Sequence, residues 1–168
     1  MRSQIRKGFT LIELLVVIAI IGLLSTLAVV AMSNARLKAR DAKRVSDVKQ
    51  SQSALDLYAA DKNGYPTDGT EGVAAGLTLG GASAKCLDNA SGYKASGCVE
   101  PIYMGLVPKN PTPKGADYVY TSYSDAANTT TCDASPCVSY KMTFTLEADT
   151  GELKKGACSA TPGGITCP

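Results

Sequence analysis

An acidic residue near the start of the chain is the first candidate for chemistry, because its neighbours are apolar. Glu13 follows Leu11 and Ile12 and directly precedes Leu14–Ala35, a run of 22 residues without a charge. A carboxylate in such a segment costs about 2.5–3.5 kcal/mol on membrane-insertion scales, so it normally has a partner. We therefore expect Glu13 to pair with a positive group.

Cleavage of the chain just upstream would create such a group. The residues before Leu11 read Arg6-Lys7-Gly8-Phe9-Thr10, a short basic leader ending in glycine and followed by an aromatic residue. A cut after Gly8 would leave the new α-amine of Phe9 four residues, or about one helical turn, from Glu13. The block therefore predicts a processing site between Gly8 and Phe9.

Six cysteines form the second candidate set, and all lie in the second half of the chain. Their number is even and no pair has Cys-x-x-Cys spacing. Because the chain has no histidine, a zinc site would need four thiolates from irregular positions. We predict disulfides, with reduced thiols and a metal site as alternatives, and disulfides place this part outside the cytoplasm. The cysteines are Cys86, Cys98, Cys132, Cys137, Cys158 and Cys167.

Composition and charge argue against the commonest kinds of enzyme and against a nucleic-acid-binding protein. The absence of histidine removes the usual general base and any Ser-His-Asp triad. The net charge is +2, yet residues 61–168 carry eight positive and eleven negative side chains. Duplex binding normally needs a basic patch. We therefore predict no enzymatic activity, no cofactor, no metal and no nucleic-acid partner.

The charge-free run has the dimensions of a membrane span. As a helix it would be about 33 Å long, which matches a bilayer core of about 30 Å. A cleaved signal peptide over residues 1–31, ending at Val29-Val30-Ala31, is the alternative. The run exceeds the usual 7–15-residue core of a signal peptide, and Glu13 interrupts its start. We favour a retained anchor.

The helical pattern continues beyond the run without a stop signal until Asn63-Gly64 and Tyr65-Pro66. A single helix from about Phe9 to Asp61 would be about 80 Å long. Apolar residues in its second half keep the spacing of one helix face, and the charged residues between them predict a solvated face. The apolar set is Leu37, Val45, Val48, Leu55, Tyr58 and Ala59; the charged set is Arg36, Lys38, Arg40, Asp41, Lys43, Arg44, Asp47 and Lys49.

Strands with alternating side chains are expected to cover the apolar stripe. The predicted strands are 118–123, 139–146 and a short third one at 152–155 after the turn Asp149-Thr150-Gly151. Residues 63–117 are predicted to be mostly loop, with a short helix near 101–106. The fold class is α+β, a long N-terminal helix packed against a small antiparallel sheet with disulfide-stapled loops. The expected divisions are a cleaved leader (1–8), a transmembrane or filament-core helix (9–35), an amphipathic helix (36–62) and a head (63–168).

The N-terminal block resembles the class III signal of type IV pilins and type II secretion pseudopilins, residue by residue. The resemblance implies that a prepilin peptidase cleaves Gly8–Phe9 and methylates the Phe9 amine. It also implies that Glu13 pairs with the Phe9 amine of an adjacent subunit, and that the helices leave the membrane to form the core of a filament.

The resemblance continues through residues 36–67, including Gly64-Tyr65-Pro66-Thr67, so that it covers roughly residues 1–67 strongly and the rest only in architecture. Many members of the family have a proline where this chain has Val30. The expected function is a pilin, the subunit of a type IV pilus-like filament. The alternatives are a major pseudopilin of a type II secretion system and, in another class, a membrane-anchored extracellular binding domain.

The expected partners follow from the same resemblance: the prepilin peptidase, the inner membrane, like subunits in a homopolymer, and pilus or secretion assembly machinery. The N-terminus is expected in the cytoplasm and the head outside, and later in an extracellular filament at the cell surface. Counting charges alone gives a conflict, because Arg36–Arg44 carries five positive charges against one negative charge. The leader motif and the cysteines decide for the head outside.

Six cysteines allow 15 pairings. Pairing of neighbours, 86–98, 132–137 and 158–167, would staple three weakly structured segments, so we favour it. A long-range pairing of Cys137 with Cys158 or Cys167 is the alternative. Asp149-Thr-Gly-Glu152 is interpreted as a turn, and the alternative is a calcium site, which some pseudopilins have in this region.

Overall fold

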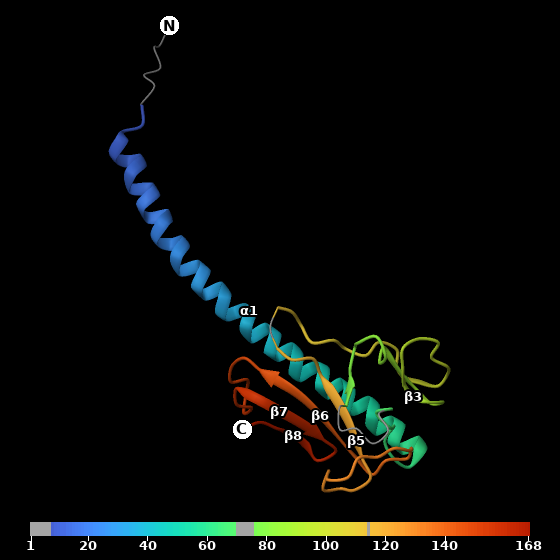
Figure 1. The fold of residues 1–168 in the computed structure, drawn as a ribbon. Coiled ribbons are helices and arrows are strands. Elements are labelled where there is room, and N and C mark those ends of the chain that lie inside the picture. Colours follow the sequence, from blue (N-terminus) through green and yellow to red (C-terminus); the bar gives the residue numbers. More distant parts are fainter. Residues whose placement is uncertain (1–7, 70–75, 114) are drawn as a thin grey trace. The chain divides into compact units, whose positions relative to one another are not determined.

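The computed structural model in Figure 1 describes residues 8–69, 76–113 and 115–168. Its one long element is α1 (Leu11–Lys62), an α-helix of 52 residues. The chain forms two compact units, residues 1–37 and residues 38–168, and α1 contributes to both. The charged part of the leader, residues 1–7, lies outside the described residues.

The first unit is a helix that exposes its apolar side chains. Leu11, Ile18, Leu23 and Val29 are all more than half exposed. An 18-residue window of the helix reaches a mean hydropathy of 2.9, so by length and composition it could cross a membrane. The predicted span is thus present as regular helix, and Val30 lies within it without a break.

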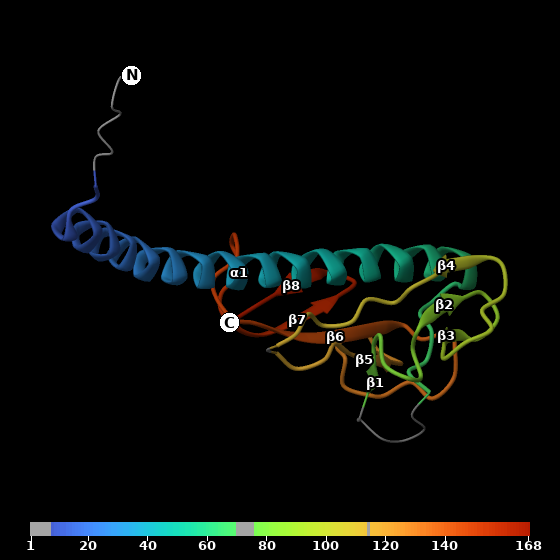
Figure 2. The same ribbon diagram turned by 90° about the horizontal axis from the view of Figure 1, so that it is seen from above.

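The second unit holds two antiparallel sheets, which Figure 2 shows beside the second half of α1. The larger sheet has the order β1 (Leu77–Thr78), β5 (Val119–Tyr123), β6 (Ser139–Leu146), β7 (Gly156–Thr161) and β8 (Gly164–Thr166). The smaller sheet has the order β3 (Gly92–Lys94), β2 (Cys86–Asp88) and β4 (Ile102–Met104). The predicted α+β class with an antiparallel sheet is confirmed.

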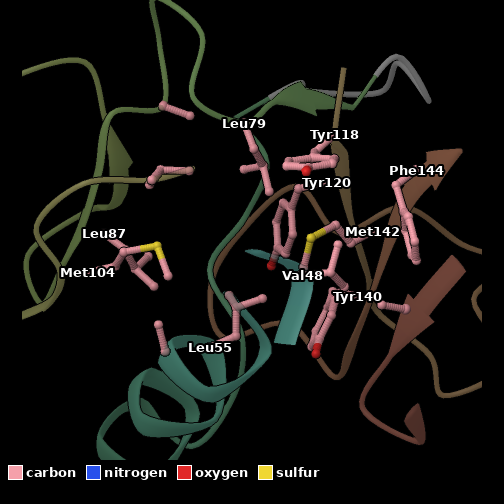
Figure 3. Packing of buried hydrophobic residues seen from close by; sticks show 14 of the residues in the cluster. Val48, Leu55, Leu79, Leu87, Met104, Tyr118, Tyr120, Tyr140, Met142 and Phe144 are labelled. Atoms are coloured by element: carbon pink, nitrogen blue, oxygen red, sulfur yellow. The ribbon is translucent and has the colours of Figure 1, made fainter. Parts of the chain in front are cut away.

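The core lies between α1 and the larger sheet (Figure 3). Val48, Leu55 and Tyr58 of the helix are buried, as the predicted stripe requires. Strand β6 supplies Tyr140, Met142, Phe144 and Leu146, which alternate with more exposed residues. This period of two is what a strand with one buried face needs.

The helix ends where the sequence predicted. Asn63 has a left-handed backbone with φ of 56°. A Cβ on Gly64 would lie 2.6 Å from the carbonyl oxygen of Cys137, so only glycine allows the close approach. Tyr65 and Cys137 then exchange two backbone hydrogen bonds, of 2.8 and 2.9 Å. These bonds fix the helix end to the segment that carries the middle disulfide.

The helix predicted near 101–106 is wrong, because residues 102–104 form β4. Leu87 of β2 pairs with Met104, and Asp88 pairs with Ile102. A free helix of six residues would be too short to be stable. Pairing with β2 gives hydrogen-bond partners to the backbone groups of β4, which a short helix would leave without partners. Residues 63–117, predicted to be mostly loop, contain four short strands, β1 to β4.

The third predicted strand, 152–155, is also wrong. The larger sheet resumes only at Gly156, where β7 begins. Thr150 and Leu153 instead exchange backbone hydrogen bonds of 2.9 and 3.1 Å. Asp149 Oδ1 accepts a bond from the Lys155 amide at 2.9 Å. Because the turn satisfies its own backbone groups, the strand starts later than the residue types suggest.

Candidate functional site

The first turn of α1 forms a reciprocal cap around Thr10 and Glu13. The Glu13 carboxylate accepts hydrogen bonds from the Thr10 amide at 2.8 Å and from Thr10 Oγ1 at 2.7 Å. Thr10 Oγ1 in turn accepts from the Glu13 amide at 3.3 Å. This is a capping box, which satisfies amides that a helix start leaves without partners. Both bonds to the carboxylate end on the same oxygen, Oε2.

The predicted processing site lies just before this cap. Phe9 is 82% exposed, and Gly8 is exposed as well. A Cβ on Gly8 would meet no atom within 4 Å, so the described structure imposes no steric need for glycine there. The chain around Gly8 and Phe9 is therefore accessible to an enzyme, and the glycine has to be explained by something other than packing.

Three disulfides staple the second unit. They join Cys86 with Cys98, Cys132 with Cys137, and Cys158 with Cys167. These are the partners of the local scheme, and the long-range pairing does not occur. Each bridge closes a segment whose strands are short or absent, and the last one joins β7 to the tail that follows β8.

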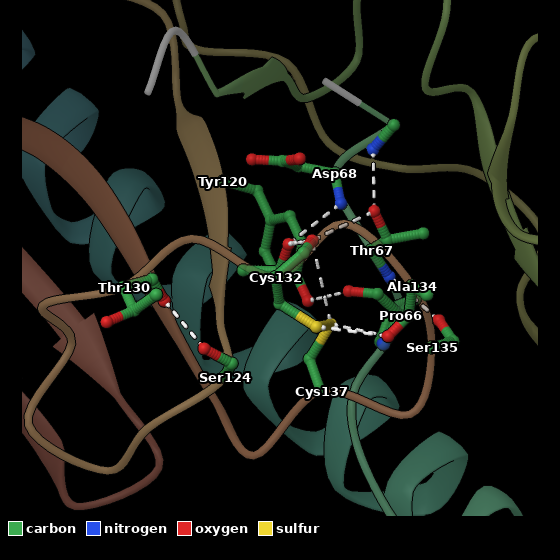
Figure 4. Close-up of a disulfide and its surroundings, with 12 residues drawn as sticks. Pro66, Thr67, Asp68, Tyr120, Ser124, Thr130, Cys132, Ala134, Ser135 and Cys137 are labelled. Atoms are coloured by element: carbon green, nitrogen blue, oxygen red, sulfur yellow. Dashed lines mark hydrogen bonds between the residues drawn. A yellow bond between two sulfur atoms is a disulfide. The ribbon is translucent and has the colours of Figure 1, made fainter. Parts of the chain in front are cut away.

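Figure 4 shows the middle disulfide with the loop that follows the helix. Thr67 Oγ1 donates to the carbonyl of Cys132 at 3.3 Å, and the Thr67 amide donates to Ser135 Oγ at 3.0 Å. Beside them, Tyr120 of β5 donates its hydroxyl to the carbonyl of Pro66 at 2.6 Å. The bridge and these bonds fasten the helix end, the loop and the sheet together.

A buried charge cluster in the second unit has no counterpart in the sequence-based prediction. Arg44 is fully buried and contacts Asp41 Oδ1 at 2.5 Å, Glu147 Oε1 at 2.7 Å and Asn110 Oδ1 at 2.9 Å. Arg40 binds both carboxylate oxygens of Glu147, at 2.9 and 2.6 Å. Asp41 accepts from the amide of Glu147 at 3.1 Å. The cluster ties the helix to the end of β6.

This cluster corrects the predicted solvated face of the helix. Asp41, Arg44 and Asp47 are buried, although the sequence placed them among exposed charges. Burial is tolerated because each has an opposite charge or a hydrogen-bond partner. Asp47, for example, accepts from the Tyr118 hydroxyl at 3.2 Å. A sequence signal was available: positions 41, 44, 48, 51, 55 and 58 are spaced by three and four, and they form the buried face.

The electrostatics of the cluster favour its ionised form. Hydrogen bonds from Arg40, and then the bonds and charge of Arg44, lower the pKa of Glu147 to about 2. The hydrogen bond that Arg40 donates to Glu147 likewise raises the pKa of Arg40. Two of the five positive charges counted in residues 36–44 are therefore neutralised within the fold.

The Asp149–Glu152 segment takes the form of a turn. The carboxylate of Asp149 is engaged by Lys154 Nζ at 3.0 Å and by the Lys155 amide. Within residues 8–69, 76–113 and 115–168, no group of three or more acidic or cysteine side chains is arranged to hold a metal ion. The arrangement at Asp149 is that of an exposed ion pair.

Comparisons with known proteins give one matching family model and several similar proteins. A family model described as the prokaryotic N-terminal methylation motif matches residues 4–29. The type II secretion system core protein G of Klebsiella michiganensis is 46% identical over 67 residues, 40% of this chain and 47% of that protein. The protein of the same name from Escherichia coli is 37% identical over 113 residues, 66% of this chain and 77% of that protein.

A fimbrial protein is also similar. EcpC of Eikenella corrodens is 37% identical over 76 residues, 45% of this chain and 50% of that protein. The chain thus spans about half the length of the first relative and of EcpC, and about three quarters of the Escherichia coli protein. No solved structure matches the chain significantly.

Proposed function

This chain belongs to the type IV pilin and type II secretion pseudopilin superfamily, and from that premise we propose that it is a subunit of a pilus-like filament. Its N-terminal helix would form the filament core, and its second unit would be the head displayed on the outside. The observation that carries the proposal is the combination of a capped acid, Glu13, with a first helix half whose large apolar side chains are exposed.

Glu13 supports assembly because only part of its carboxylate is used by the cap. Both bonds from Thr10 end on Oε2, and within the described residues Oε1 accepts no hydrogen bond. We infer that Oε1 receives the methylated α-amine of Phe9 from an adjacent subunit. A prepilin peptidase would generate that amine by cutting between Gly8 and Phe9, both of which are exposed. Thr10 would orient the acid.

The exposed apolar side chains of the helix suit two apolar surroundings, one before assembly and one after it. Before assembly, the inner membrane would surround it, with the leader in the cytoplasm and the disulfide-containing head outside. After assembly, like helices would replace the lipid. A structural role of this kind requires no catalytic residues, and we propose none.

Two kinds of filament remain in view, and each has its own support. The core protein G relatives favour a pseudopilin of a type II secretion system, since the similarity to the Escherichia coli protein extends into the head. EcpC favours a surface fimbria. Three disulfides suit a filament that has to survive outside the cell. Deleting the gene and scoring surface filaments and secreted protein in the same cells separates the two.

The intact mass of the mature protein tests the shared proposal. Loss of residues 1–8 plus one added methyl group is the expected result. A mature start near Met32 would contradict it, because the helix would then have been a cleaved signal peptide. An uncleaved, unmethylated chain at the membrane would instead favour an anchored extracellular binding domain.

A further inference from the structure

One flank of the helix in the second unit borders an apolar groove. The groove has a volume of about 620 Å³ and lies between α1, the turn after β6, and β8. Val45, Leu153 and Ile165 supply its apolar lining, and Lys49 stands exposed on the helix side. We call these four residues the β8 groove. Strand β8 is an edge strand, so no further strand of the sheet covers this side.

The other flank carries two leucines that the fold leaves uncovered. Leu57 is 59% exposed and Leu106 is 79% exposed. They border a second hollow of about 370 Å³, which Ser53 also lines. We call Leu57 and Leu106 the leucine pair. Leucines exposed to this degree next to one another form an apolar patch, which on a soluble head is typical of an interaction site.

Helix geometry places the groove and the leucine pair on different sides. At about 100° per residue, positions 45 and 57 point about 120° apart and lie on opposite sides of the buried face. A surface that meets a different surface on the next copy makes a heterologous contact. Such contacts generate open helical filaments, whereas self-complementary contacts close into dimers.

We propose that the leucine pair of one subunit docks in the β8 groove of a neighbouring subunit, with the two helices parallel. This inference rests on the proposed filament function, since parallel packing follows from helices that start in one membrane. Charge supports the same register. Leu57 is 12 positions after Val45, and the exposed acid Asp61 is 12 positions after Lys49. One offset of about 18 Å therefore seats the leucine and pairs Asp61 with Lys49.

Cysteine cross-linking tests the contact in filaments of the full chain. Lys49 lines the groove, Asp61 is exposed one helical turn after Leu57, and the two are 12 positions apart, which is the proposed offset. The double variant Lys49→Cys/Asp61→Cys should give a ladder of disulfide-linked oligomers on mild oxidation. Each single variant should stay monomeric, because the contact joins two different surfaces.

Dimers from either single variant would indicate a symmetric contact and overturn the proposal. Intact filaments of the double variant without a ladder would overturn it too, while leaving the filament function standing. If the native chain forms no filaments at all, the proposed function is contradicted, and so is the contact that rests on it.

Charge reversal gives an independent measurement. Lys49→Glu and Asp61→Lys should each lower filament yield about five-fold, and the two together should restore it. Asp117→Lys, at an exposed position that lines neither hollow, is the matched control and should leave yield unchanged. Since the double reversal must recover assembly, a simple folding defect cannot imitate the result. Failure of the double variant to recover would contradict the proposed pair.

Discussion

The two halves of α1 invert the usual distribution of polar and apolar groups, each in its own way. In the first half, apolar side chains such as Leu11 and Leu23 face outwards. In the second half, Asp41 and Arg44 are fully buried. Exposing apolar side chains to water is costly, and so is taking charged side chains out of water. The difference is that the second half finds its partners within the chain, in Glu147 and Asn110, whereas the first half must find them outside it.

The largest effect is expected for Glu13, whose proposed partner is a positive charge on another subunit. Glu13→Ala should leave leader cleavage intact and lower filament yield at least about tenfold, which requires a loss of only about 1.4 kcal/mol per contact. Intact mass checks cleavage, and the yield of sheared filaments checks assembly. Glu100→Ala, which removes an exposed glutamate from the head, is the control. Unchanged filament yield with Glu13→Ala would refute the assembly role.

The next largest effect is expected for Arg44, whose partners lie within the chain. Arg44→Met leaves Asp41 and Glu147 without their shared cation, and breaking a buried pair in this way costs about 3–5 kcal/mol. Chemical denaturation of the full chain in detergent measures the change. Lys43→Met is the matched control, because Lys43 is one residue away and 58% exposed. Equal losses for the two variants would mean that the cluster does not stabilise the head.

The disulfides should contribute somewhat less. Replacing Cys158 and Cys167 together by serine should lower the free energy of unfolding by about 2–3 kcal/mol, since the closed loop is short. Peptide mapping under non-reducing conditions first establishes the pairs. A peptide linking the 126–141 region to the 156–168 region would overturn the local pairing on which this number rests.

Acid should weaken the same cluster gradually. The folded pKa of Glu147 is about 2, below the ordinary value near 4.5, so the unfolded chain binds more protons between these values. The stabilisation by Glu147 is therefore complete above about pH 4.5 and is lost as pH falls towards 2. Melting temperatures across this window measure it. Glu147→Gln should flatten the slope, and an unchanged slope would assign it to other carboxylates.

The smallest effect is expected at the exposed turn. Asp149→Asn removes an exposed ion pair with Lys154, and such pairs contribute little to stability because solvent screens them. Because Lys154 and the Lys155 amide already occupy this carboxylate, calcium or a chelator should leave the melting temperature unchanged. A rise of several degrees with calcium would show that this segment binds the ion after all.

Local patterns predicted the parts of the molecule that local forces decide. The helix stop at Asn63-Gly64, the alternation of β6 and the uncharged run are each legible within a few residues. The buried charges were not, because Glu147 is 103 positions from Arg44 and only the fold brings them together. Arg44 does lie at one of the positions, spaced by three and four, that form the buried helix face. It was nevertheless predicted to be exposed, because charged residues were assumed to face solvent.

The short strands were missed for a related reason. β4 has three residues, and its stability comes from pairing with β2 rather than from its own residue types. Gly8, Phe9 and Glu13 were predicted from a motif, and the roles proposed for them involve a peptidase and a neighbouring subunit. The sequence thus identifies such a site more readily than it identifies the surfaces that complete it.

The three short disulfide loops have a mechanical consequence. They span 12, 5 and 9 residues along the chain. At about 3.5 Å per residue, and after subtracting the 6.5, 5.8 and 4.3 Å between the paired Cα atoms, the bridges withhold roughly 75 Å of backbone from extension. If a pulled filament unravelled its heads, each subunit would lengthen by that much less and would keep three closed loops in place. The bridges therefore shorten the reach of an unravelled head without preventing its extension.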